Sequence, residues 1–130
     1  MTEGARPRPD VDQFLYDQID TVPHLEALLL LWNGRTRSWS MTEMAERLFL
    51  TAEATKEILE DLVRRSLAAT SGESVDCYRY EPDSKHDALM AAVDIAYRHE
   101  LIRVTRLIHS KPSAALRDFA RAFRLKKERE

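Results

Sequence analysis

The stretch WSMTEMAERLFLTAEATKEILEDLVRRSLAA, residues 39–69, decides the fold of this chain. Near its start, Ser40 and Glu43 stand at the spacing of a capping box, in which the serine hydroxyl accepts from the backbone amide of the glutamate and the glutamate side chain reaches back. Because this pattern marks the first turn of a helix, we predict a short helix over residues 41–48.

A second, longer helix follows after a tight turn. Thr51 can cap it, and apolar residues recur at helical spacing over residues 52–66. A short helix, a tight turn and a longer helix are the order of a helix-turn-helix. Behind them, residues 68–70 and 75–80 have the composition of two short strands, joined by the turn-forming residues 71–74. We therefore predict a β-hairpin of the size of a wing.

Further helices are predicted on both sides of this motif. Two come before it, over residues 11–19 and 24–32, separated by a break at Pro23. After it we predict one long helix over residues 86–109 and a last helix that opens at Pro112. The expected fold class is mostly α with a small β-hairpin wing. The expected organisation is a disordered tail over residues 1–10, a winged helix-turn-helix domain over residues 11–82, and C-terminal helices over residues 83–130.

The composition of the chain argues against several classes of function. The chain has 130 residues, of which 44% are hydrophobic, and it has neither a signal-peptide core nor an apolar run long enough for a membrane span, so we expect a cytoplasmic protein with no membrane partner. Three glycines are too few for a phosphate-binding loop, and the four histidines are scattered. We therefore expect no enzymatic activity, no metal site and no cofactor. The net charge of −2 counts mildly against binding of nucleic acid.

The order of elements resembles the winged-helix transcriptional regulators of the MarR, TrmB and ArsR type. The likeness covers about residues 23–82. The residues that carry it are Thr42 to Ala45 in the first helix of the motif, Leu59, Leu62, Arg64 and Leu67 at the end of the second, and Cys77 to Tyr80 in the returning wing strand. The sequence departs from the family at Ser66, where a glycine is usual.

The resemblance implies that the helix over residues 52–66 enters the major groove of double-stranded DNA and that the hairpin lies along the adjacent backbone or minor groove. It also implies a homodimer, with an effector cleft between the dimer helices and the winged domain. The predicted DNA contacts are Thr51, Thr55 and Lys56 at the helix start, Arg64 and Arg65 near its end, Arg79 on the wing, and Arg35 and Arg37 in the preceding loop. The predicted dimer interface contains Ile95, Ile102, Leu116, Phe119 and Phe123.

The charge of the predicted recognition helix speaks against DNA. If its apolar residues face the core, the side chains turned outward are Glu53, Lys56, Glu57, Glu60 and Arg64, and three of these five are acidic. Two hypotheses therefore stay open. The first is a homodimeric DNA-binding transcriptional regulator. The alternative is a winged-helix protein-protein interaction module that binds no DNA and docks on another regulatory protein, through the acidic helix face or a ridge of Arg117, Arg121 and Arg124.

One acidic residue lies inside the predicted long helix. Glu100 falls within its apolar face, where an unpaired carboxylate would be costly. We expect it to pair with an arginine such as Arg98, Arg103 or the partner's Arg106 and to fix the register of this helix, or else to lie exposed at the end of the interface.

Overall fold

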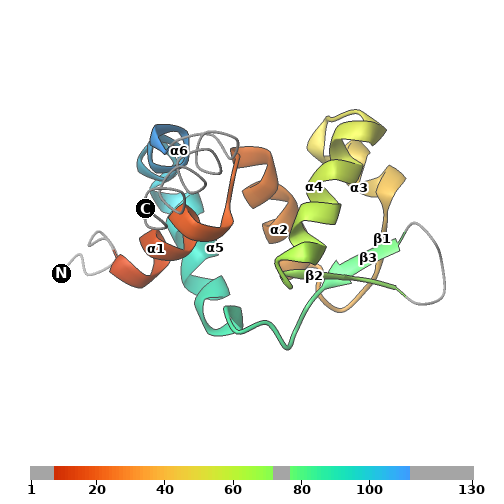
Figure 1. Cartoon of the computed structure of the whole chain (residues 1–130), viewed down its shortest axis with the longest axis horizontal. Helices are drawn as coiled ribbons and strands as arrows, with labels where there is room; N and C mark the ends of the chain where they lie inside the picture. Colours follow the sequence, from red (N-terminus) through yellow and green to blue (C-terminus); the bar gives the residue numbers. More distant parts are fainter. Residues whose placement is uncertain (1–7, 72–76, 112–130) are drawn as a thin grey trace, which may run out of the picture.

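The computed structural model of the chain describes residues 8–71 and 77–111 and is mostly helical with one small sheet (Figure 1). The predicted fold class is confirmed. In chain order the elements are α1 (Pro9–Gln18), α2 (Val22–Asn33), β1 (Trp39–Ser40), α3 (Met41–Leu48), α4 (Ala52–Arg64), β2 (Ala68–Thr70), β3 (Cys77–Tyr80), the 3-10 helix η2 (Asp87–Leu89), α5 (Met90–His99) and α6 (Leu101–Ser110). Within the described part, no helix is long and apolar enough to span a membrane.

Both predicted helix starts in the motif are confirmed by their caps. The Ser40 hydroxyl accepts from the Glu43 amide at 3.0 Å, and the Glu43 carboxylate accepts from the Ser40 amide at 3.1 Å. The Thr51 hydroxyl accepts from the amide of Ala54 at 3.1 Å and so begins α4. These side chains satisfy amides that have no partner within the helix, which is why each helix begins where it does.

α4 ends at Arg64, two residues earlier than the sequence predicts. The amide of Leu67 donates back to the carbonyl of Leu62 at 2.9 Å, and Ser66 turns into the left-handed region with φ 59°. This conformation closes the helix and sends the chain into β2. It also explains why a glycine is usual at this position in the regulators that the sequence resembles, because a side chain at positive φ is strained.

Replacement of Ser66 by glycine is therefore expected to stabilise the fold. Relief of the left-handed strain, reduced by the greater freedom of glycine in the unfolded chain, should raise the free energy of unfolding by about 0.5–1 kcal/mol. Urea denaturation of the wild type and of Ser66→Gly measures this. A lower unfolding midpoint in the variant would mean that the serine side chain contributes more than its backbone strain costs.

The sheet has the strand order β1-β3-β2, with both pairs antiparallel. Trp39 pairs with Tyr78, and Ala69 pairs with Arg79. The sequence predicted the hairpin but missed β1, whose two residues are too few for a periodic pattern. Tyr78 is buried while Arg79 is exposed, as expected for the alternating faces of a strand.

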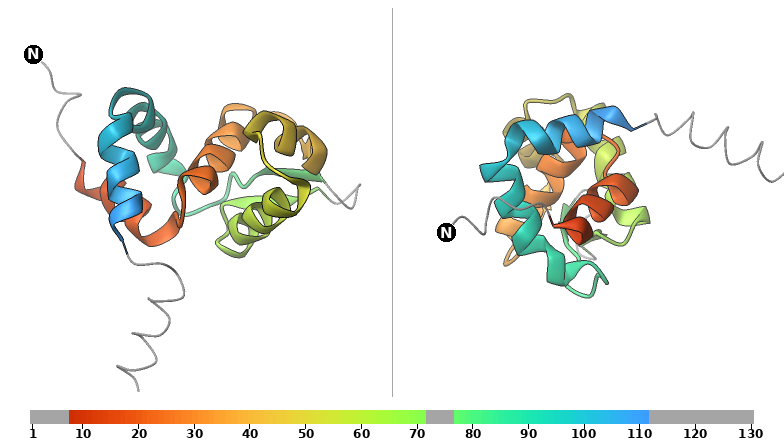
Figure 2. Two further views of the ribbon diagram at one scale, coloured as in Figure 1. Left: turned by 90° about the horizontal axis from the view of Figure 1, so that it is seen from above. Right: turned by 90° about the vertical axis from the view of Figure 1, so that its left-hand side faces the viewer.

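The helices form two groups with α2 between them, α1, α5 and α6 at one end and α3, α4 and the sheet at the other (Figures 1 and 2). α1 packs against α6, and Arg103 of α6 donates to Asp12 of α1 at 2.9 Å. The predicted division at residue 82 thus separates α1 from the helices that it contacts. Residues 9 and 10, which were assigned to the tail, are the first residues of α1.

The single long helix predicted over residues 86–109 is wrong. The 3-10 helix η2 precedes α5, and α5 and α6 are separated at Glu100, whose backbone leaves the helical region with φ −131° and ψ 45°. The predicted pairing of Glu100 is confirmed, because its carboxylate accepts from Arg103 at 3.0 Å. The break directs α6 onto α1, where Val104 and Ile108 are buried.

Candidate DNA-binding surface

The outer face of α4 is open to solvent, as the sequence predicts for the second helix of the motif. Ile58, Leu59 and Leu62 are buried against the rest of the winged domain. The residues turned outward are Glu53, Lys56, Glu57, Glu60 and Arg64. Among the described residues, neither Glu53 nor Glu57 has an ion-pair partner, so both carboxylates stay uncompensated on this face.

Two predicted contacts at the start of α4 are accessible and one is not. Thr51 is exposed, and Lys56 is exposed with its ammonium 4.0 Å from Glu60. Thr55 is a correction, because it is 0% exposed and its hydroxyl donates to the carbonyl of Thr51 at 2.8 Å. The sequence held the signal for this, since position 55 precedes Ile58, Leu59 and Leu62 by three, four and seven residues and so lies on the same face.

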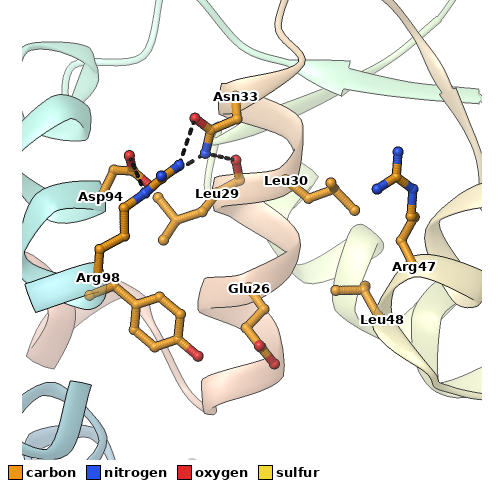
Figure 3. Close-up of a pocket in the computed structure, with 9 residues that line it drawn as sticks. Glu26, Leu29, Leu30, Asn33, Arg47, Leu48, Asp94 and Arg98 are labelled. Atoms are coloured by element: carbon orange, nitrogen blue, oxygen red, sulfur yellow. Dashed lines mark hydrogen bonds and ion pairs between the residues drawn. The ribbon is translucent and has the colours of Figure 1, made fainter.

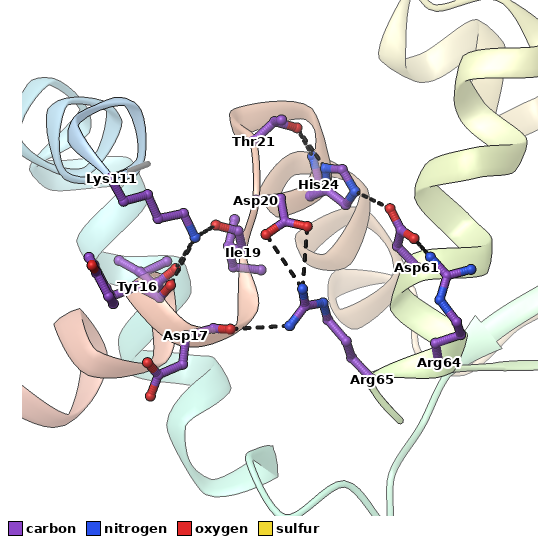
Figure 4. A network of polar contacts seen from close by, with 11 residues as sticks. Tyr16, Asp17, Ile19, Asp20, Thr21, His24, Asp61, Arg64, Arg65 and Lys111 are labelled. Carbon is purple, nitrogen blue, oxygen red and sulfur yellow. Dashed lines mark hydrogen bonds and ion pairs between the residues drawn. The ribbon is translucent and has the colours of Figure 1, made fainter. Parts of the chain in front are cut away.

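The two arginines at the end of α4 point to different partners. Arg64 is exposed, and its guanidinium pairs with Asp61 one turn earlier. Arg65 is half-buried and turns away from the open face, where it donates to the carbonyl of Asp17 at 3.1 Å and lies 3.3 Å from the carboxylate of Asp20 (Figure 4). Arg65 is therefore corrected from a DNA contact to a link between α4 and the segment that joins α1 to α2.

Arginines also surround the tryptophan that starts the motif. Arg37 stacks over the ring of Trp39 with its guanidinium carbon 4.0 Å from the ring centroid, and it pairs with Glu43. Arg47 lies over the same ring at 5.7 Å. The ring packs so closely on Gly34 that a Cβ there would lie 2.6 Å from a ring carbon, and hence only glycine fits this loop. The sequence did not single out Arg47, because its contact with Trp39 exists only in the folded chain.

The remaining predicted DNA contacts, Arg35 and Arg79, are exposed, and each donates a hydrogen bond to a backbone carbonyl of the chain. Arg35 lies over the Trp32 ring, 4.6 Å from its centroid, and donates to the Trp32 carbonyl at 2.9 Å. Arg79 is exposed on β3 and donates to the Tyr80 carbonyl at 3.4 Å. Both guanidinium groups have five N–H donors each, so these bonds leave donors free for another acceptor.

A polar junction connects α4 to the first two helices (Figure 4). The imidazole of His24 lies 2.9 Å from the Asp61 carboxylate through Nε2 and 2.6 Å from the Thr21 hydroxyl through Nδ1. Because a carboxylate only accepts, Nε2 donates to Asp61, and in the neutral ring Nδ1 accepts from Thr21. At the other end of the junction, the buried Lys111 ammonium donates to the carbonyls of Leu15, Tyr16 and Ile19.

Asp20, His24 and Asp61 offer ligand atoms that lie within 4.8 Å of one another, a grouping that the sequence did not reveal. Such a group could hold a metal ion. In this structure, however, Asp20 pairs with Arg65, Asp61 pairs with Arg64, and Nδ1 of His24 is occupied by Thr21. The cationic partners already balance both carboxylates, and we therefore interpret the group as part of the junction.

Burial lowers the pKa of His24 below its ordinary value of 6.5. The negative charge of Asp20 raises this pKa, and the positive charges of Arg65 and Lys111 lower it, so the net shift is downward. Since the unfolded chain then binds protons more readily than the folded one, stability is expected to fall as the pH drops through 6.5. Burial also lowers the pKa of His86, which adds to the effect.

Urea denaturation at about pH 7.5 and about pH 5.5 tests this for the wild type and for His24→Gln. The wild type should lose stability at the lower pH, and the variant should lose less, because only His86 then contributes among these two groups. An equal loss in both proteins would show that His24 has no part in the pH dependence.

A cleft of about 450 Å³ opens between α2, α3 and α5 (Figure 3). Leu29, Leu30 and Leu48 form the apolar part of its lining. At its polar edge, Arg98 contacts Asp94 at 3.0 Å and Asn33 at 3.3 Å. Burial beside Glu26 raises the pKa of Tyr97, another lining residue, to about 12. The cleft lies between the winged domain and the C-terminal helices, where the resemblance implies an effector.

The two predicted dimer residues that the structure describes are exposed. Ile95 of α5 is 54% exposed and Ile102 of α6 is 67% exposed, with Leu101 beside it at 49%. Leu116, Phe119 and Phe123, like the arginine ridge of residues 117–124, lie outside the described residues. The exposed side chains of Ile95 and Ile102 are the described ones that the predicted dimer would bury.

Comparisons with known proteins show the fold. No protein-family model matches the sequence, and no curated protein matches it. Among solved structures, the adhesin competence repressor AdcR from Streptococcus pyogenes is 17% identical with a TM-score of 0.50, over 90% of this chain and 84% of that chain. A variant of MepR from S. aureus is 16% identical with a TM-score of 0.50, over 91% of this chain and 85% of that one. Both are winged-helix regulators of the MarR family. The winged-helix fold is therefore confirmed.

Proposed function

We propose that this protein is a transcriptional regulator, not an enzyme, and that it binds double-stranded DNA as a homodimer through α4. The observation that carries the proposal is the open outer face of α4 in a helix-turn-helix, from the capping Thr51 to Arg64, with nothing of the described chain packed on it. In such motifs the second helix lies in the major groove and its first residues contact the bases. AdcR, which has the same fold, is named a repressor.

The phosphate contacts come from Lys56, Arg64, Arg37, Arg35 and Arg79, to which the structure adds Arg47. Three of these cations have acidic partners in the chain, Glu60 for Lys56, Asp61 for Arg64 and Glu43 for Arg37, and the cationic side chain of each pair is exposed. Exposed ion pairs are worth only about 0–1 kcal/mol. Exchange of Glu43 or Glu60 for a phosphate oxygen therefore costs little, whereas the half-buried Asp61 keeps His24 as a second partner when Arg64 leaves it.

Glu53 and Glu57 oppose binding of the backbone. Each is exposed on α4 without a compensating cation among the described residues, and each repels phosphates. The affinity must then come from a small number of cations, together with contacts to base edges. A glutamate that faces a base edge can accept from the amino group of cytosine, which gives these two residues a use in the groove.

In the proposed homodimer, a second copy of the chain covers the exposed side chains of Ile95 and Ile102. Pairing through α5 and α6 places two copies of α4 on one duplex. Such a dimer reads two half-sites that are related by its twofold axis and are separated by about one helical turn or a multiple of it. The preferred sequence is therefore a palindrome.

The test is fluorescence anisotropy of the purified protein with a pool of genomic DNA fragments, at low and at physiological salt, followed by sequencing of the bound fraction. Enrichment of a short palindrome, with an affinity that falls steeply with salt, is the expected result. A protein that binds no fragment even at low salt would contradict the proposal, and the acidic face of α4 would then have to serve a protein partner.

A further inference from the structure

Phe49 combines two unfavourable features at one position. It ends α3 in the left-handed region with φ 57° and ψ 43°, and its side chain is 93% exposed. Residues with a Cβ rarely adopt this conformation, and helices that end in it usually have glycine there. Phenylalanine is also a residue that folding normally buries. Neither the backbone conformation nor the packing of this domain requires a phenylalanine at position 49.

The turn itself would form equally well without the ring. The amide of Phe49 donates to the carbonyl of Glu46 at 3.4 Å, and the amide of Leu50 donates to the carbonyl of Ala45 at 3.1 Å. Both bonds are made by the backbone alone. A strained residue that persists in a turn is a reason to look for a function, and because the ring makes no contribution to the turn, we look for that function outside the domain.

The other large apolar side chains exposed in the described part lie elsewhere. Ile95, Leu101 and Ile102 belong to α5 and α6, and Tyr16 on α1 has the ammonium of Lys111 5.9 Å from its ring centroid. Among the described residues of α3, α4, the sheet and their connections, Phe49 is thus the one large apolar side chain that is exposed, and it lies two residues before Thr51, which caps α4. It marks the end of α4 that a helix-turn-helix directs at base pairs.

The chemistry of this end favours a neutral contact. The exposed residues that follow Phe49 are Thr51, Ala52 and Glu53, which provide a hydroxyl, a methyl group and a carboxylate but no positive charge. An aromatic ring needs no counter-charge. The apolar group that a base pair presents in the major groove is the 5-methyl of thymine, and phenylalanine is one of the residues that contact it.

We propose that Phe49 packs its ring on the 5-methyl group of a thymine in each half-site and so sets part of the sequence preference. This inference rests on the proposed function, because it needs a duplex in contact with α4. Contact of the ring with a methyl group also adds affinity for DNA despite the repulsion between the acidic face of α4 and the phosphates. Dispersion and burial of apolar surface do not depend on charge.

The experiment uses the full chain and the palindromic duplex enriched from genomic fragments, prepared with thymine and, at one thymine position at a time, with uracil, which lacks the methyl group. The wild type is expected to bind about tenfold more weakly when the contacted thymine is replaced in both half-sites, the size of a single lost base contact. Phe49→Ala should bind the thymine duplex about tenfold more weakly and should no longer distinguish thymine from uracil there.

Two further variants separate the ring from the backbone. Phe49→Gly should unfold at a higher urea concentration than the wild type and yet bind as weakly as Phe49→Ala. Ser66→Gly removes the left-handed strain at the other end of α4, and it should raise the unfolding midpoint while binding the duplex like the wild type. A binding loss confined to the Phe49 variants then belongs to the ring.

Three results would overturn the inference. In the first, Phe49→Ala binds the thymine duplex as tightly as the wild type. In the second, it binds weakly but keeps the same preference for thymine over uracil at every position. In the third, no uracil substitution weakens the wild type. If the wild type binds no duplex at low salt, the proposed function itself has failed, and this outcome differs visibly from the other three.

Discussion

A variant with both Ile95→Glu and Ile102→Glu is expected to be a folded monomer that binds the selected palindrome at least about 100-fold more weakly than the wild type. The two side chains are largely exposed in a single chain, so glutamate at either position creates no cavity and disturbs no described contact. In the proposed dimer the same substitutions bury four unpaired carboxylates, which no small interface tolerates.

The large loss of DNA affinity follows from the loss of the second half-site. When two α4 helices are joined in one dimer, the second binding event is intramolecular, and this raises the affinity by about 10²- to 10⁴-fold over a single site. Sedimentation velocity gives the oligomeric state, and anisotropy on the palindrome gives the affinity. On a duplex with one half-site, the variant and the wild type should differ far less.

Ala88→Glu is a control for added charge, because Ala88 is exposed on η2 and the substitution adds one of the two negative charges that the double variant adds per chain. It should sediment and bind like the wild type. A double glutamate variant that is still a dimer would place the interface elsewhere, for instance on residues 112–130. A monomer with wild-type affinity for the palindrome would contradict the dimeric mode of binding.

The second large effect is expected from charge reversal on α4. A variant with Lys56→Glu and Arg64→Glu should lose about 100-fold in affinity and should show a salt dependence shallower by about two phosphate contacts per subunit of the dimer. Both side chains are exposed, and Lys56 pairs with the exposed Glu60, whereas Arg64 pairs with the half-buried Asp61, which also accepts from His24. The variant should therefore fold with somewhat reduced stability, which the circular dichroism spectrum and urea denaturation measure.

Its control carries the same total change in charge at positions away from α4. Arg8→Glu with Lys85→Glu alters two exposed cations, one before α1 and one in the segment between β3 and η2. This variant should bind close to the wild type. If both double variants lose affinity equally, the protein responds to its net charge only, and α4 is not the surface that meets the phosphates.

Local chemistry in the sequence predicted most of the fold. The pairs of Ser40 with Glu43 and of Thr51 with the start of α4 are decided within a few residues, so helix starts could be read directly from the chain. The break at Glu100 could not, because it lies where Arg103 contacts both Glu100 and Asp12, and Asp12 is 91 residues away from Arg103 in the chain. No proline or glycine marks that position.

The candidate site was less predictable than the fold. The burial of Thr55 was available from helical spacing, whereas the inward turn of Arg65 depends on Asp17 and Asp20, which lie on a distant segment. The same holds for the junction of His24 with Asp61, which are separated by 37 residues. Phe49 gave no signal in the sequence either, since its importance lies in a backbone angle and an exposed fraction that only the folded chain possesses.

The central claim, that α4 of each subunit enters the major groove, is tested most directly by dimethyl sulfate footprinting on the selected duplex. This reagent methylates guanine N7 in the major groove and adenine N3 in the minor groove. We expect guanine N7 to be protected in two stretches separated by about one helical turn or a multiple of it, and Lys56→Glu with Arg64→Glu to abolish the protection. Unprotected guanines under a saturating concentration of bound protein would show that α4 lies outside the groove.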